Sequence, residues 1–172
     1  MLEGKRIYLR KITSADTDYI IYWRSQEFVR NNFIYQGPFT KDVHENWLKT
    51  KVETGNVVQF IIYDKIKNLP IGSVYLRDID HINSRAEYGI FIGEKDYLGK
   101  GIGAEAGTLV LDFAFKDLHL HKIMLKAFAQ NVRAIKNYKK AGFIEEGYMK
   151  DEVRRGDTYY DIVYMAKINN EI

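Results

Sequence analysis

The chain has 172 residues, a formal net charge of +3 at pH 7 and no cysteine. That length predicts one domain spanning residues 1–172, and the lack of cysteine excludes disulfides, thiol catalysis and zinc–thiolate sites. Basic and acidic residues are interspersed, so the charge pattern does not favour a nucleic-acid partner. The N-terminal residues are charged and no apolar run reaches 18 residues, so we expect no membrane partner and a cytoplasmic location.

Hydrophobic periodicity predicts strands and helices in a mixed order. In chain order we expect a strand at 7–12, helices at about 15–24 and from residue 41, strands at 57–63, 71–76 and 86–92, a helix over 102–114, a strand at 122–129, a helix between Asn131 and Gly142, and strands at 143–153 and 158–166. Residues 28–39 are aromatic-rich and irregular. This β-α-α-β-β-β-α-β-α-β-β order predicts a mixed α/β fold, largely antiparallel, with one parallel unit over about 86–129.

The most informative motif is the glycine-rich stretch 98–103, Leu-Gly-Lys-Gly-Ile-Gly, which leads into the predicted helix over 102–114. Glycines allow a positive φ, and amides at a helix N-terminus bind anions such as a phosphate or diphosphate. The alternative is a tight strand-to-helix connection that binds nothing. A P-loop is excluded because no Gly-Lys-Ser/Thr occurs. The dinucleotide fingerprint fits in part, but the next predicted strand lacks the required acidic residue at its end.

A second motif, Asn131-Val-Arg-Ala-Ile-Lys-Asn137-Tyr138 followed by Gly142-Phe143, comes one predicted strand after the glycine loop. Together the two motifs resemble the GNAT superfamily of acetyl-CoA-dependent N-acetyltransferases, in the branch with ribosomal-protein N-terminal and polyamine acetyltransferases. The resemblance implies the GNAT fold and transfer of an acetyl group from acetyl-CoA to a primary amine by direct attack in a ternary complex. Leu98 stands where the family usually has Gln or Arg, which favours the alternative of a non-catalytic CoA-binding regulatory domain.

The resemblance also implies roles for individual residues. Tyr138 would protonate the leaving thiolate, its alternative being a core tyrosine. Glu87 would act as the base through water, its alternative being a salt-bridged strand residue, with Arg85 as the suggested partner. The strand at 86–92 would splay from 122–129, and a backbone N–H near residues 92–93 would face the thioester carbonyl. The implied cofactor-binding residues are Phe91, Ile92, Leu98, Gly99, Lys100, Gly101, Ile102, Gly103, Asn131, Asn137 and Tyr138.

The acceptor is a separate question. Trp23-Arg24 with Val29-Arg30 resembles acetyltransferases acting on nucleotide-linked 4-amino sugars, which implies that Trp23, Arg24 and Arg30 bind substrate. The alternative is an ordinary amphipathic helix with Trp23 in the core and Arg24 in a salt bridge. A protein N-terminal amine or a polyamine remains a further alternative, although Glu27 is the only acidic residue in 19–39. The four histidines form no metal set, so we expect no metal. We expect the protein to be a monomer or a homodimer.

Overall fold

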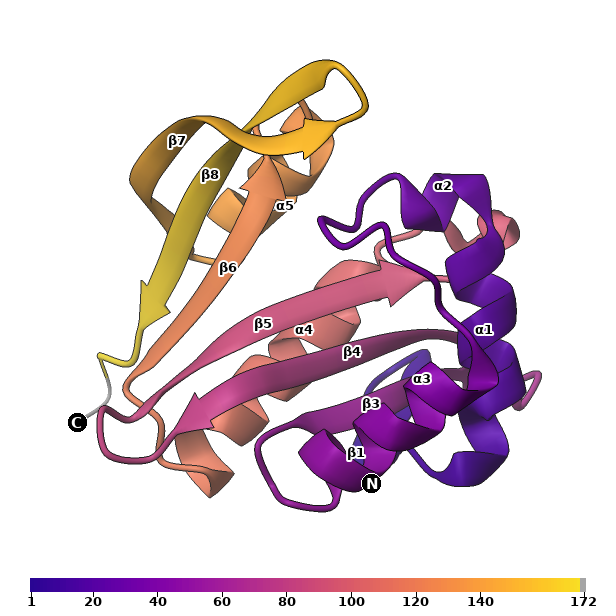
Figure 1. The fold of residues 1–172 in the computed structure, drawn as a ribbon. Helices are drawn as coiled ribbons and strands as arrows, with labels where there is room; N and C mark the ends of the chain where they lie inside the picture. Colours follow the sequence, from indigo (N-terminus) through magenta and orange to yellow (C-terminus); the bar gives the residue numbers. More distant parts are fainter. Residues whose placement is uncertain (171–172) are drawn as a thin grey trace.

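The computed structural model describes residues 1–170 and contains an eight-stranded sheet (Figure 1). Its strands are β1 (Leu2–Glu3), β2 (Ile7–Lys11), β3 (Val58–Asp64), β4 (Leu69–Asp80), β5 (Arg85–Ile92), β6 (Lys122–Phe128), β7 (Ile144–Arg155) and β8 (Thr158–Ile168). They lie in the order β1-β2-β3-β4-β5-β6-β8-β7. Only β5 and β6 run parallel among the paired strands of residues 1–170. The predicted mixed sheet with one parallel unit is therefore confirmed.

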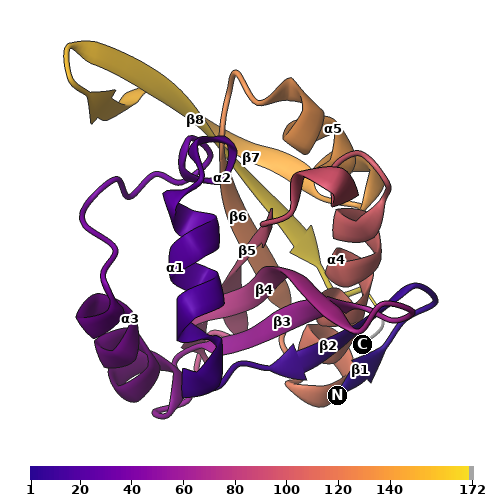
Figure 2. The same ribbon diagram turned by 90° about the vertical axis from the view of Figure 1, so that its right-hand side faces the viewer.

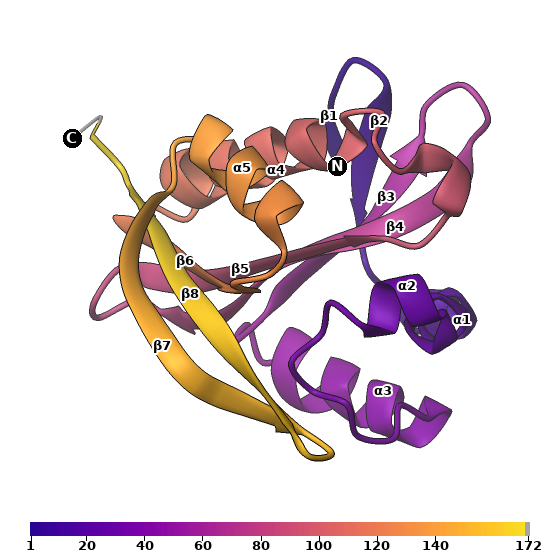
Figure 3. The same ribbon diagram turned by 90° about the horizontal axis from the view of Figure 1, so that it is seen from above.

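Helices cover both faces of the sheet (Figures 2 and 3). On one face lie α1 (Thr17–Ser25), α2 (Glu27–Arg30) and α3 (Lys41–Trp47), and on the other lie α4 (Ile102–Asp112) and α5 (Val132–Lys140). None of the helices within residues 1–170 combines the length and apolar composition that crossing a bilayer requires.

Alternating strand residues supply two separate cores. On β3, Phe60 and Ile62 pack on the α4 side while Ile61 packs on the α1 side, because successive side chains point to opposite faces. Ala106 and Val110 form part of the apolar stripe of α4 and are fully buried in the first core. The helically spaced apolar residues that predicted α4 thus form its buried face.

Two short elements were not predicted. The β1 strand has two residues, with Leu2 opposite Leu9, and is too short for a periodic signal. The α2 helix occupies the start of the segment expected to be irregular, and the extended backbone of Gln26 (φ −67°, ψ 130°) separates it from α1.

Candidate active site

The parallel strands β5 and β6 pair at one end and diverge toward the other (Figure 1). They pair only at Arg85↔Lys122, Ala86↔Ile123 and Glu87↔Met124, and beyond these pairs the strands diverge. The register between β4 and β5 continues to Gly72↔Ile92. One edge of β5 is therefore free of a neighbouring strand just where the other edge is still paired, which confirms the predicted splay.

The register shows which backbone groups face this gap. The amide of Gly93 donates to the carbonyl of Ile71 at 2.8 Å, so the facing pair Gly72↔Ile92 does not exchange hydrogen bonds. Because alternate residues of a strand turn their N–H and C=O to opposite sides, Ile90 and Ile92 present theirs to the gap. Ile92 is thus available to a ligand, whereas the amide of Gly93 is already used.

Phe91 does not fit the expected cofactor role. Its backbone turns toward Ser73 on β4, and its ring is buried against Trp23 and Phe33 at centroid distances of 6.1 and 5.5 Å. The residue belongs to the core beneath α1, because the strand period places it on the face opposite to α4. These contacts do not favour cofactor binding by the Phe91 side chain, and cofactor binding by Phe91 and by Ile92 both stay predictions.

The glycine loop enters α4 with two residues in the left-handed region. Gly99 has φ +75° and Gly101 has φ +76°, and Gly101 is the N-cap of α4. The first helical hydrogen bond is donated by the amide of Glu105 to the carbonyl of Gly101 at 3.1 Å. Within residues 1–170, no protein acceptor takes a hydrogen bond from the amides of 99–104. Unpartnered amides and the positive end of a helix dipole attract anions, so this turn is the candidate anion site.

Room for a ligand exists at the same place. A Cβ added to Gly103 would meet only the Cδ1 of Ile90, at 3.8 Å, among the described residues. That distance is ordinary van der Waals contact, so packing within the protein does not demand glycine there. A glycine that the fold itself does not require fits a loop approached closely by a diphosphate.

An ion pair that sequence reasoning missed supports this loop. Glu105 accepts from the Arg6 amide at 2.8 Å and from Arg6 Nε at 2.9 Å, and Arg6 Nη1 donates to the Lys100 carbonyl at 2.6 Å. Burial alone would raise the pKa of Glu105, but the hydrogen bonds from Arg6 outweigh it and leave the pKa lowered. The start of β2 thereby holds the loop and the first turn of α4 together.

A second anchor lies just before the loop. The hydroxyl of Tyr97 donates to Asp64 Oδ2 at 2.7 Å, which ties the loop to the end of β3. Leu98 itself is 40% exposed. The structure thus holds the loop through Tyr97 and Arg6, and the departure from the family pattern at Leu98 leaves the loop amides in place.

Tyr138 lies on the buried side of α5. Its ring contacts Tyr88 and Phe143 edge-on, at centroid distances of 6.3 and 5.9 Å. Burial, with a smaller contribution from Tyr75, raises the pKa of Tyr138 to about 12. The phenol therefore remains protonated throughout the neutral range and can hold a proton for donation.

The two asparagines of α5 differ in their surroundings. Asn131 caps the helix, accepting from the Ala134 amide at 3.2 Å, and its Nδ2 donates to Asn32 Oδ1 at 3.1 Å. Asn137 is exposed, and its carbonyl accepts from the Ala141 amide within the last turn. The predicted cap is confirmed for Asn131, while cofactor binding by either residue stays a prediction.

Glu87 is held by two cations. One carboxylate oxygen accepts from Arg77 Nη2 and the other lies 3.3 Å from Lys126 Nζ. Arg85, the partner suggested from the sequence, instead lies 3.4 Å from Asp80 Oδ2. Glu87 is therefore salt-bridged, as the alternative stated, but its partners are Arg77 and Lys126 and not Arg85. Its base role stays a prediction, in which a water would share an oxygen with one of these cations.

The residues predicted to bind the acceptor differ in their exposure to solvent. Trp23 is fully buried in the α1-side core, and its Nε1 donates to Glu94 Oε1 at 2.8 Å. It is therefore a core residue and not a substrate contact, as the alternative stated. Arg30 is exposed at the end of α2.

Two roles were predicted for Arg24, which were substrate binding and a salt bridge on an amphipathic helix. The structure shows a different environment from the second. Its guanidinium stacks on Phe33 and Phe39, 3.5 and 4.3 Å from the ring centroids. The expected salt bridge does not form with any described residue, and its buried Nε has no hydrogen-bond partner within 1–170. Burial lowers the pKa of Arg24. A partly buried cation without an anionic partner is thus present on the α1 side of the sheet.

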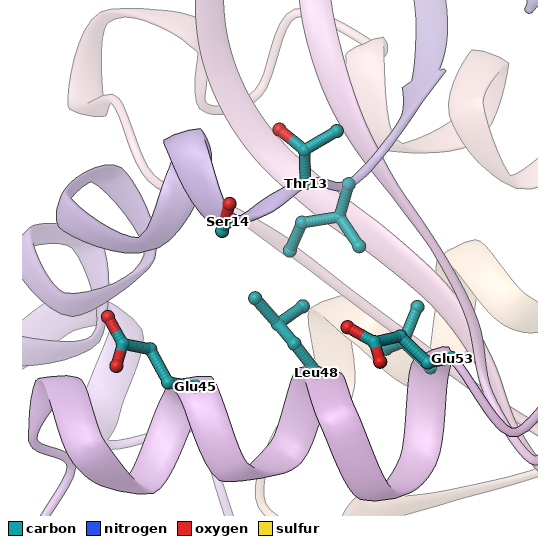
Figure 4. A pocket seen from close by; sticks show the side chains of 7 residues that line it. Thr13, Ser14, Glu45, Leu48 and Glu53 are labelled. Atoms are coloured by element: carbon teal, nitrogen blue, oxygen red, sulfur yellow. The ribbon is translucent and has the colours of Figure 1, made fainter.

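A separate hollow lies away from these residues (Figure 4). It has a volume of about 420 Å³ and is lined by Ile12, Thr13, Ser14, Glu45, Leu48, Val52 and Glu53. None of the predicted site residues lines it. Within residues 1–170, no three His, Asp or Glu side chains gather in a group suited to a metal ion.

The open parallel pair, the glycine loop and the helix after it define the fold of acyl-CoA N-acyltransferases. Residues 6–144 match the family model described as an acetyltransferase (GNAT) domain. The chain therefore belongs to the GNAT acetyltransferase family and is an N-acetyltransferase, which confirms the resemblance drawn from its two motifs.

Among its relatives, the spermidine N(1)-acetyltransferase of Vibrio cholerae is 33% identical over 127 residues, covering 74% of this chain and 67% of the relative. A putative ribosomal N-acetyltransferase of Bacillus subtilis is 25% identical and covers 81% of this chain and 76% of its own. The crystal structure of the Vibrio cholerae spermidine N-acetyltransferase with CoA and spermine has a TM-score of 0.88, 26% identity and 95% coverage of both chains. A structure of that enzyme in an intermediate state is dodecameric; the monomer or homodimer expected here stays a prediction.

Proposed function

We propose that this protein transfers the acetyl group of acetyl-CoA to a primary amine by direct attack in a ternary complex. The observation that carries the proposal is the gap between β5 and β6, which opens beside a loop of unpartnered amides. The amides of 99–104 would hold the diphosphate, and the free edge of β5 would receive the pantetheine arm like an added strand. Bound acetyl-CoA supplies an acyl group activated as a thioester.

The chain's own groups would prepare the reaction. The amide of Ile92 is a preorganised donor facing the gap, and such a donor aimed at a developing oxyanion contributes about 3–4 kcal/mol. Tyr138 holds a proton that it can give to the departing sulfur. A primary amine near the lysine pKa of about 10.4 is only about one part in 10³ neutral at pH 7, so Glu87, acting through water, would take its proton.

The unpartnered guanidinium of Arg24 favours a negatively charged acceptor. Burying a cation without a partner is costly, and an anionic group on the substrate would remove that cost. Arg30 adds a second cation that has no carboxylate partner among residues 1–170. We therefore propose a nucleotide-linked amino sugar as the acceptor, with Arg24 and Arg30 facing its phosphates and the amine directed toward the gap.

A polyamine is the second candidate, favoured by the identity with the Vibrio cholerae enzyme. Within residues 19–39, Glu27 is the only acidic residue that could attract a polycation. Glu94 accepts the indole hydrogen bond of Trp23, and Glu87 is engaged by Arg77 and Lys126. A protein N-terminal amine, suggested by the ribosomal relative, is a third candidate. It would need neither a pair of cations nor a cluster of carboxylates in the acceptor site.

Thiol release from acetyl-CoA tests these acceptors side by side. We expect a higher kcat/KM with a nucleotide-linked 4-amino sugar than with spermidine or an alanine-terminated peptide, and a selective loss in Arg24→Gln. Arg85→Gln, which removes an exposed arginine paired with Asp80 at the other end of β5 from the gap, serves as the control. A preference for spermidine that Arg24→Gln leaves unchanged would replace the proposed acceptor. CoA binding without turnover on any amine would instead favour the non-catalytic alternative.

A further inference from the structure

Arg133 lies beside the glycine loop although it belongs to another helix. It is in the first turn of α5, and its Nη2 lies 3.3 Å from the position that a Cβ on Gly99 would occupy. The Asn131 cap holds this turn of the helix in place. The guanidinium therefore rests against the face of the loop that carries no side chain.

The charge of Arg133 is uncompensated, unlike that of the other arginine at the loop. Arg6 gives its Nε to Glu105 and its Nη1 to the Lys100 carbonyl. Among residues 1–170, Arg133 has neither a carboxylate within ion-pair distance nor a hydrogen-bond acceptor, and its side chain is exposed. One arginine thus supports the loop from within the protein, and the other faces the place where a ligand would lie.

The chemistry of the two groups is complementary to a phosphate. The loop offers unpartnered amides and the partial positive charge of a helix N-terminus, roughly half an elementary charge. A guanidinium adds a full charge and can bind two phosphate oxygens at once. We propose that Arg133 binds a phosphate of the cofactor, so that α4 and α5 together build the phosphate site. This inference rests on the proposed binding of CoA at the loop.

Calorimetric titration of Arg133→Gln with CoA, 3′-dephospho-CoA and pantetheine tests the proposal without relying on turnover. We expect a Kd for CoA about tenfold weaker than in the wild type, equivalent to about 1.4 kcal/mol. The Kd for pantetheine, which has no phosphate, should be unchanged. Lys136→Gln removes the same charge from an exposed position of α5 and should change the Kd for CoA less than twofold.

Dephospho-CoA distinguishes the two possible phosphates. A tenfold loss that persists with dephospho-CoA assigns Arg133 to the diphosphate, and a loss that disappears assigns it to the 3′-phosphate; either result supports the inference. An unchanged Kd for CoA in Arg133→Gln, or an equal loss for pantetheine, overturns it. A wild-type protein that binds CoA no more tightly than pantetheine would overturn the loop assignment as well, so the two failures are distinguishable.

Discussion

At the scale of single residues, Tyr138 shows how surroundings change a chemical role. An ordinary phenol, with a pKa near 10, would protonate a thiolate near 8.5 at a cost of about 2 kcal/mol. Burial raises the pKa of Tyr138 to about 12, and against the same thiolate the cost becomes about 5 kcal/mol. Dry surroundings also raise the pKa of a thiol, so a sulfur lying beside Tyr138 would recover part of this difference.

We predict that Tyr138→Phe lowers kcat by about 100-fold, because a positioned acid contributes about 10²–10⁴-fold. The phenyl ring keeps the contacts with Tyr88 and Phe143, so the Kd for CoA should stay within about twofold and the fold should be retained. Steady-state kinetics and calorimetric titration measure the two quantities. An unchanged kcat, with chemistry shown to be rate-limiting, would remove Tyr138 from the mechanism.

At the scale of elements, the entry to α4 depends on a backbone conformation that only glycine adopts easily. Gly101, at φ +76°, begins the helix, and a Cβ there would lie 3.3 Å from Arg6 Nη2. Gly55 has a similar φ of +80°, but a Cβ on it would meet no described atom within 4 Å. Substitutions at Gly101 and Gly55 therefore introduce similar backbone strain, but only the one at Gly101 affects the loop.

We therefore predict that Gly101→Val weakens CoA binding at least tenfold, because the side chain displaces Arg6 and distorts the amides of the loop. Gly55→Val should cost a similar strain, about 1–3 kcal/mol of stability, and leave the affinity for CoA unchanged. Thermal melting and calorimetric titration of both variants provide the comparison. Equal affinities for CoA in the two variants would mean that the loop is a connector only.

Another element-scale consequence concerns the packing of α3 on α1. His44 is buried, and its Nδ1 lies 3.0 Å from Thr17 Oγ1. Burial lowers the pKa of His44 from 6.5 to about 4, opposed by Asp16 and assisted by Arg24. Between these pH values the unfolded chain binds a proton that the folded protein does not, so stability falls as the pH falls from 6.5 toward 4.

The predicted loss from His44 over that interval is about 3 kcal/mol. His44→Asn preserves a donor near Thr17 and has no titrating ring, so its free energy of unfolding should depend less steeply on pH. Urea denaturation of both proteins at pH 7 and pH 4.5 measures the difference, and the carboxylates common to both cancel. Parallel pH dependences would show that His44 protonates freely in the folded protein.

At the scale of the whole molecule, the sheet has two parts, β1–β5 and β6–β8, which pair at the narrow end of the gap. Side-chain contacts link the β7–β8 hairpin to residues 31–33 across the open end. Arg155, at the tip of the β7–β8 hairpin, donates from Nη1 to the Asn31 carbonyl at 3.1 Å and from Nη2 to the Phe33 carbonyl. Asn131 joins Asn32 nearby. In Figure 2 the yellow hairpin passes above α2, and its tip lies beyond that helix. These contacts bound the space where the acceptor is proposed to bind.

We predict that Arg155→Ala raises the acceptor KM about tenfold, because residues 31–33 lose two charge-assisted hydrogen bonds, each worth about 1.5–3 kcal/mol. The Kd for CoA should not change, since the glycine loop lies on other elements. Arg154→Ala, which removes a neighbouring arginine paired with Asp157, is the matched control. An equal KM in the two variants would show that the link does not shape the acceptor site.

The position of the candidate site in the fold was predictable because its signals are local in sequence. Glycines before an amphipathic helix predict an anion-binding turn, and the spacing around Tyr138 places it on a helix one strand later. The register of the sheet then decided that Ile92 faces the gap whereas Phe91 does not. Strand alternation alone cannot distinguish the two faces when both are covered by helices.

The sequence by itself determined the element types, the family and the loop that begins α4, since short-range backbone preferences and periodic burial encode them. Only the tertiary structure decided that Trp23 is core, that Glu87 pairs with Arg77 and Lys126, and that Arg133 lies against Gly99. Those pairs come from elements far apart in the chain, and their contacts arise when β5 and β6 separate and helices pack on opposite faces of one sheet.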